Sequence, residues 1–378
     1  MSRAWAEVDL GAVRSNVRAL RRLSGRDLIA VVKANAYGHG AVPVARAALE
    51  AGARGLAVAT VEEALELHEA RLAPVLILGA LLEEEVLPAL AARAAITVHS
   101  VDEVARLARV ARSLDQEARV HVEVDVGLAR HGVRPEEALE VVEAALGTRG
   151  VRMEGLMCHL ALAGDREAAL EALGRFEPVV HAVRTRTQRV LVHAAASTAA
   201  LTLEEARHDL VRPGIALHGI DDGASRGALR PTLALRAKVV RTREIEAETP
   251  VGYGATWTAH RKTKLAIVGM GYDDGLPYRL SNRGRLLVHG ASCPIVGTVM
   301  MDFVVCDVTD APPVHAGDTA TAIGRDGRDT ITVEEVARNA GVIPYVVTCG
   351  LGRRSKRVFL GAEQVALTTS AQLRRRLG

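Results

Sequence analysis

The chain has 378 residues, of which 49% are hydrophobic and 25% charged, and its formal net charge is +3. This length predicts two domains, because a single core stops growing at roughly 250 to 300 residues, and the interspersed charges argue against nucleic acid as a partner. With neither a membrane span of roughly 18 apolar residues nor the apolar core of a secretion signal, we expect a cytoplasmic protein.

Residues 1–225 alternate short strand-like runs with segments of helical spacing. Several runs are apolar on consecutive residues, which is typical of parallel strands covered on both faces. Two of the helical segments begin with a capping box, Thr60 with Glu63 and Ser100 with Glu103. The eight expected strands are 28–32, 56–60, 75–79, 95–99, 119–125, 153–159, 189–194 and 209–215.

Eight such units in about 200 residues predict a (β/α)8 barrel of the TIM type. A doubly wound open sheet is the alternative, because a count of strands does not by itself show closure. In a barrel the chemistry lies at the carboxyl ends of the strands, so the residues placed there are the candidates for a functional site.

Lys33 ends the first expected strand. The chain has only five lysines among 48 basic residues, so a lysine at the end of a buried strand calls for a reason specific to an amine. Lysine forms a Schiff base with a carbonyl group and arginine does not. A lysine that reaches from a strand end to solvent is the structural alternative.

The last two strands carry the residues typical of a phosphate site. Ser197 and the backbone amides of Gly214 and Ile215 fit that role, although a serine at this place also serves as a helix cap. A Schiff-base lysine together with a phosphate pocket indicates pyridoxal 5'-phosphate. If Arg212 faces the pyridine nitrogen, the ring stays neutral and rapid proton exchange at Cα is favoured, whereas an ordinary ion pair is its alternative role.

From about residue 226 the alternation stops, and Gly, Pro and Asp separate strand-like runs with one helix expected near 332–339. We expect residues 226–378 to form a second, mostly β domain, to which the first residues of the chain add a strand. Glycines on both sides of Tyr253 leave its phenol projecting, although a half-buried sheet tyrosine is equally ordinary.

The chain resembles the bacterial alanine racemases over essentially its whole length. The motifs that carry the resemblance are WAEVDLGAVRSN, AVVKANAYGHG, VDVGLARHG, VRPGIALHG, VGYGATW, GYDDGLP, VGTVMMD and IPYVVTCGLGRR. The resemblance implies a pyridoxal-phosphate enzyme that interconverts L-alanine and D-alanine and supplies D-alanine for peptidoglycan. It also implies a head-to-tail homodimer in which each active site is completed by the partner subunit.

The resemblance assigns roles to individual residues. Lys33 is similar to the lysine that binds the cofactor and acts as one base, and Tyr253 to the opposite base, contributed by the other subunit. Arg212 matches the partner of the pyridine nitrogen, and His159 the residue that links this arginine to the tyrosine. Arg130 resembles the residue that holds the substrate carboxylate. The phosphate shell corresponds to Tyr37, Ser197, Gly214, Ile215 and Tyr345, and the substrate entrance to Met301 and Asp302.

The chain departs from the family pattern at three positions. Many members have a carbamylated lysine where this chain has Glu123, and we expect this glutamate to pair directly with Arg130, although an ordinary ion pair is the alternative. Ala196 replaces an asparagine, and His218 replaces a tyrosine. The last two changes affect fine positioning and not the class of reaction.

Other activities remain as alternatives. A barrel-type amino-acid decarboxylase lacks its usual Cys-Asp pair here, and a non-catalytic pyridoxal-phosphate carrier would have no second domain. A racemase of broader specificity, acting on serine or basic amino acids, is harder to exclude from the sequence. No residue is assigned to a metal. Free buried thiols are expected for all four cysteines, Cys158, Cys293, Cys306 and Cys349.

Overall fold

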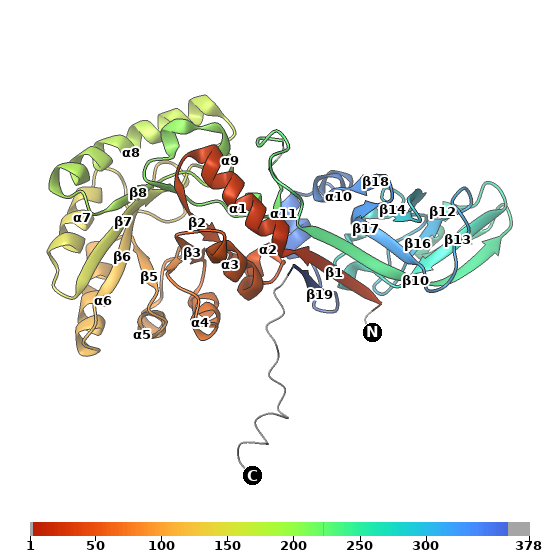
Figure 1. Ribbon diagram of the computed structural model, residues 1–378, viewed down its shortest axis with the longest axis horizontal. Helices are drawn as coiled ribbons and strands as arrows, with labels where there is room; N and C mark the ends of the chain where they lie inside the picture. The colour runs from red at the N-terminus through yellow and green to blue at the C-terminus, as the bar shows by residue number, and fades with distance from the viewer. Residues whose placement is uncertain (1–2, 222, 362–378) are drawn as a thin grey trace, which may run out of the picture.

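The computed structural model describes residues 3–221 and 223–361, and Figure 1 shows a barrel with helices on its outside beside a region made mostly of strands. The predicted barrel is confirmed. All of its strands are parallel, and the order in the sheet is β8-β7-β6-β5-β4-β3-β2-β9. The strands are β2 (Asp27–Val31), β3 (Gly55–Val58), β4 (Val75–Ile77), β5 (Ala95–Val98), β6 (Ala118–Val124), β7 (Val151–Cys158), β8 (Leu191–His193) and β9 (Leu210–Val211).

The ends of this sheet come together beyond β8 and β9. A parallel bridge joins Ala196 to Arg212, and the amide of Arg212 donates to the carbonyl of Ala195 at 2.8 Å. A doubly wound open sheet has two free edges and no such contact. The structure therefore excludes that alternative.

Helices cover the outside of the barrel. The expected caps form: the Thr60 hydroxyl accepts from the amide of Glu63, and the Ser100 hydroxyl from that of Glu103. The helices are α1 (Leu10–Ser24), α2 (Lys33–Tyr37), α3 (Ala41–Glu50), α4 (Val61–Glu69), α5 (Val86–Ala91), α6 (Val101–Ser113), α7 (Ala138–Gly147), α8 (Arg166–Arg186) and α9 (Ser197–Thr202). Within the described residues, no helix combines the length and apolar character that crossing a bilayer requires.

The second region is a nine-stranded sheet with a small hairpin beside it. Its strands are β1 (Ala4–Asp9), β10 (Leu233–Ile245), β13 (Thr263–Val268), β14 (Arg285–Val288), β15 (Ala291–Pro294), β16 (Val304–Asp307), β17 (Thr319–Asp326), β18 (Asp329–Ile331) and β19 (Lys356–Leu360). The hairpin consists of β11 (Pro250–Val251) and β12 (Trp257–Thr258). The predicted helix is α10 (Val333–Ala340), capped by the Thr332 side chain. Residues 362–378 of the predicted second domain lie outside the described residues.

The amino-terminal strand belongs to this second sheet. β1 lies antiparallel to β10 and parallel to β19, and Figure 1 shows it running beside β10, away from the barrel. Helix α1 follows β1 directly and packs on the barrel next to α3 and α9. Residues 4–24 therefore connect the two regions.

Two local expectations were wrong. The strand expected at 209–215 is only two residues long, because Gly214 turns the chain into a short 3-10 helix at Ile215–His218. A second helix, α11 (Pro344–Cys349), was not predicted, because six residues are too few to show a helical period. It lies between the barrel and the β sheet, next to α2 (Figure 1).

Asn16 joins α1 to the segment that leaves the barrel, and we expect Asn16→Ala to lower the free energy of unfolding. Its buried amide donates to the carbonyls of Leu217 and Arg230 at 3.0 and 2.8 Å and accepts from the Arg230 amide at 2.8 Å. Loss of these bonds leaves backbone groups unpaired and costs about 3 kcal/mol in urea unfolding at fixed protein concentration. Arg18→Ala, on the exposed face of α1, is the control, and a comparable loss in both variants contradicts the assignment.

Candidate active site

The segment after Lys33 forms one turn of left-handed helix. Ala34, Asn35, Ala36 and Tyr37 have φ values of 51°, 54°, 52° and 54°, a conformation that costs roughly 1 to 2 kcal/mol per residue for L-amino acids. Side chains hold the turn: Glu63 Oε1 accepts from the Ala34 amide at 2.6 Å, and Asn35 Oδ1 from the Ala41 amide at 2.7 Å. The tight turn places Lys33 and Tyr37 in the same cavity.

This cavity has a volume of about 670 Å³ and opens at the carboxyl ends of the barrel strands. It brings together nine of the residues predicted from the sequence: Lys33, Tyr37, Arg130, His159, Ser197, Arg212, Gly214, Ile215 and Tyr345. These residues come from five strand ends and from α11, so their meeting depends on the closed barrel and on the docking of α11.

The Lys33 amine has a lowered pKa. Burial in the cavity is the main cause, and the positive charge of Arg130 adds to it. A lysine with a lowered pKa is more often deprotonated, and the free amine is the form that attacks a carbonyl or accepts a proton. The alternative of a lysine extended into solvent does not describe this side chain.

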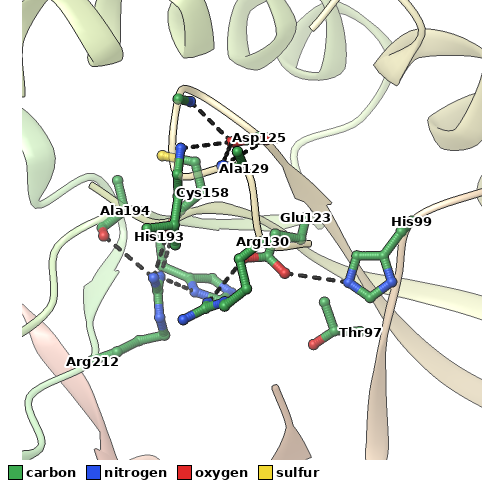
Figure 2. A network of polar contacts seen from close by, with 12 residues as sticks. Thr97, His99, Glu123, Asp125, Ala129, Arg130, Cys158, His193, Ala194 and Arg212 are labelled. Atoms are coloured by element: carbon green, nitrogen blue, oxygen red, sulfur yellow. Dashed lines mark hydrogen bonds and ion pairs between the residues drawn. The ribbon is translucent and has the colours of Figure 1, made fainter. Parts of the chain in front are cut away.

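Arg212 is 3% exposed and is surrounded by neutral acceptors (Figure 2). Its guanidinium donates to Nδ1 of His193 at 2.7 Å and to the carbonyls of His193, Cys158 and Ala194 at 2.5, 2.7 and 3.3 Å. The alternative of a surface ion pair is wrong. Because no carboxylate touches it among the described residues, its positive charge acts on the cavity.

His159 shows the effect of that charge. Burial, followed by the charges of Arg212 and Arg130, lowers its pKa to about 4, so the ring is neutral at neutral pH. Within the described part of the chain, Arg212 makes no hydrogen bond to His159. In this structure Arg212 therefore acts on His159 through its charge and not through a hydrogen bond.

Backbone amides converge at another corner of the cavity. Ser197 Oγ accepts from the amides of Gly214 and Ala216 at 3.0 and 3.3 Å, and the N-cap of α9 is Ala196 and not Ser197. The Tyr37 ring lies against Gly214 so closely that a Cβ there would be 2.1 Å from the phenol oxygen. A glycine is needed at this position, and the Ser197 hydroxyl, which accepts from these amides, can donate its own hydrogen to a phosphate group.

Glu123 faces Arg130, at 3.6 Å between Oε1 and Nη2. Its other oxygen lies 3.2 Å from Nε2 of His99 (Figure 2). Nδ1 of the same histidine lies 3.2 Å from Glu103. Burial lowers the pKa of His99, but the two carboxylates outweigh it and raise the value to about 9. Glu123 is thus shared between a protonated histidine and Arg130.

We compared the chain with known protein families and proteins to find the family to which it belongs. Residues 8–222 match the family described as "Alanine racemase, N-terminal domain", and residues 232–359 match "Alanine racemase, C-terminal domain". An alanine racemase of Symbiobacterium thermophilum is 40% identical over 370 residues, which cover 96% of this chain and 98% of that protein. The chain belongs to the alanine racemase family.

Solved structures agree with this family. The alanine racemase from D-cycloserine-producing Streptomyces lavendulae superposes with a TM-score of 0.90 at 36% identity and covers 96% of this chain and 98% of its own. The alanine racemase from Bartonella henselae, solved with covalently bound pyridoxal phosphate, gives a TM-score of 0.83 at 28% identity over 95% and 100% of the two chains.

Three residues that the family resemblance assigns to the site do not line the cavity of this single chain. Tyr253 is 74% exposed, on a turn between Gly252 and Gly254, and the Thr298 hydroxyl donates to its carbonyl at 2.9 Å. Met301 is 52% exposed, and Asp302 pairs with Arg354 at 2.6 Å. The structure of one racemase chain therefore leaves the cavity without the second base assigned from the family.

The sequence did not reveal every residue around the site. His121 and His193 form a hydrogen bond inside the barrel, and only the alternation in VHVEV, which puts His121 on the same strand face as Glu123, hinted at it. The expectation of buried cysteines is wrong for Cys349. It ends α11, near Lys33 at the open side of the barrel, and is exposed.

The charge on His99 predicts a pH dependence of stability. The folded pKa of about 9 lies above the ordinary value of 6.5. The contribution of His99 to the free energy of unfolding is therefore complete below pH 6.5 and is lost as the pH rises through about 9. At about 1.4 kcal/mol per pKa unit, we expect wild type to lose about 3 kcal/mol more than His99→Gln over this range in urea unfolding. His68→Gln, on the exposed face of α4, is the control, and parallel pH curves for wild type and His99→Gln would disprove the charged state.

Proposed function

We propose that the chain interconverts L-alanine and D-alanine with pyridoxal 5'-phosphate as cofactor and supplies D-alanine for peptidoglycan in the cytoplasm. The observation that carries the proposal is the cavity in which the Lys33 amine, the Arg212 guanidinium and the amide corner at Ser197 meet. Membership of the alanine racemase family supports it, as does the pyridoxal phosphate bound in the Bartonella henselae relative.

The residues present fit this cofactor. Lys33, with its lowered pKa, would carry it, and Ser197 with Gly214 and Ile215 would receive the phosphate, beside Tyr37 and Tyr345 in the same cavity. When bound, pyridoxal phosphate withdraws electrons from Cα of an amino acid, so that the Cα proton becomes acidic enough to leave.

Arg212 limits how strong this electron withdrawal becomes. Its guanidinium only donates hydrogen bonds and keeps its proton, so it would hold the ring nitrogen of the cofactor as an unprotonated acceptor. The three carbonyls and the His193 ring hold this side chain in place. Arg212 would thereby limit the reaction to a proton exchange at Cα with no other bond broken.

Two bases on opposite faces of Cα complete the proposed mechanism. Lys33 Nζ would move the proton on one face, and Tyr253 of the partner subunit would serve the other face, since racemisation requires the proton to leave from one side and return to the other. Exposure of Tyr253 on its turn supports this role, because a head-to-tail homodimer would bury the phenol in the neighbouring cavity.

Further roles follow from the same arrangement. Arg130, which faces Glu123 at 3.6 Å, would hold the substrate carboxylate. Met301 and Asp302 would line the entrance of the partner's cavity.

We place the domain boundary at 225 and 226, in the connection between β9, which ends at Val211, and β10, which begins at Leu233.

Exchange of the Cα proton tests the function. We expect holoenzyme in deuterated water to exchange Cα hydrogen of L-alanine for deuterium while optical activity falls to zero, and Lys33→Ala to do neither. Lys264→Ala, with an exposed amine on the sheet, is the control. Exchange with retained chirality would contradict a racemase, and equal rates on L-serine or L-lysine would favour the broader specificity.

Hybrid dimers test the shared site. Neither Lys33→Ala nor Tyr253→Phe homodimers contain an intact site, but a hybrid has one site with both wild-type residues, so we expect about half of the wild-type activity per dimer. Two different affinity tags allow the hybrid to be isolated and its composition checked by mass. An inactive hybrid of confirmed composition would place both bases in one chain, and an active Tyr253→Phe homodimer would remove Tyr253 from the mechanism.

A further inference from the structure

The barrel contains a second cavity at the opposite end from the first. It has a volume of about 540 Å³ and is lined by residues from the amino ends of the strands, among them Ile29 of β2, Val75 of β4, Met153 of β7 and Leu191 of β8. Barrel enzymes place their chemistry at the carboxyl ends, so nothing in the proposed racemisation uses this space.

The charged groups around this second cavity are mostly cationic. Its lining contains four arginines and one carboxylate, that of Glu154, which lies 2.7 Å from Arg152 and 3.7 Å from Arg119. Two further carboxylates are weakly paired with the arginines, Asp27 with Arg54 and Glu117 with Arg152, each at 3.9 Å. Arg189 has no ion-pair partner among the described residues.

A buried histidine reaches into this cavity from inside the barrel. His121 is 5% exposed and lines the cavity, and its Nδ1 lies 2.8 Å from Nε2 of His193. Its ring lies flat against Gly155 of the neighbouring strand, where a Cβ would be 2.1 Å from Nδ1. A side chain at position 155 would therefore collide with this ring.

The hydrogen bonds determine which ring nitrogens carry protons. Arg212 only donates, so Nδ1 of His193 accepts and its proton is on Nε2. His193 Nε2 then donates to Nδ1 of His121, which leaves the proton of His121 on Nε2. Among the described residues nothing accepts from that nitrogen, so a row of donors runs from Arg212 to the second cavity and ends unpaired.

We propose that the cavity at the amino end of the barrel binds a small oxyanion, such as phosphate or a dicarboxylate, which accepts a hydrogen bond from Nε2 of His121 and pairs with the arginines at the rim. The cavity offers donors and positive charge and little to accept a hydrogen bond, which is the chemistry of an anion site. An anion there would accept the last hydrogen bond of the row that begins at Arg212 in the upper cavity.

Titration calorimetry with holoenzyme tests the site, because bound cofactor already fills the phosphate corner of the upper cavity. We use inorganic phosphate and succinate as probes and expect at least one of them to bind once per protomer. Binding should weaken about tenfold in Arg119→Gln and in Arg189→Gln, which remove rim charges without touching the upper cavity. Arg328→Gln, in the loop between β17 and β18, changes the same charge at a distance and should bind like wild type.

His121→Phe removes the proposed donor and should weaken binding by a similar factor if circular dichroism shows a native fold; the two rim variants decide the question if it does not fold. Binding by neither probe, or equal affinity in wild type, the two rim variants and the control, which indicates an adventitious ion only, would overturn the proposal. The readout is binding, so it stays independent of whether the chain racemises alanine.

Discussion

A buried guanidinium without a contacting carboxylate organises the interior of the barrel. Burying a cation is costly unless its donors are satisfied, and three carbonyls with the His193 ring satisfy those of Arg212. Because none of these partners is negative, the charge acts on its surroundings. It contributes to the lowered pKa values of His159, His193 and His121, so several titratable rings around the barrel axis are neutral at neutral pH.

The left-handed turn after Lys33 is the second feature on which the site depends. Four residues in this conformation are costly, and two side-chain hydrogen bonds offset the cost: Glu63 accepts from the Ala34 amide, and Asn35 accepts from the Ala41 amide. Gly38 ends the turn so close to α11 that a Cβ would lie 2.0 Å from the carbonyl of Thr348. The turn, α11 and Tyr345 are therefore placed together, and the barrel cavity is completed by a segment from near the end of the chain.

Site residues that are defined by their neighbours in the sequence could be predicted, and those that depend on contacts with distant segments could not. Lys33 and Arg212 were identifiable because each follows a strand whose apolar run is visible in the sequence. Ser197 was ambiguous, since a serine before a helical segment usually caps it, and only the fold shows its hydroxyl on the amides of Gly214 and Ala216. His121 and His193 are 72 positions apart, so the alternation around His121 gives its strand face but not its partner.

The alternation of strands and helices, the change to a β-rich second half and the residues at the strand ends could be read from the amino-acid sequence, because periodicity and capping act within a few residues. The tertiary structure decided the closure of the barrel, the left-handed turn, the exposure of Cys349 and the protonation of the buried histidines. These depend on desolvation and on contacts between segments far apart in the chain. Burial and charge are properties of the folded neighbourhood, which no short stretch of sequence contains.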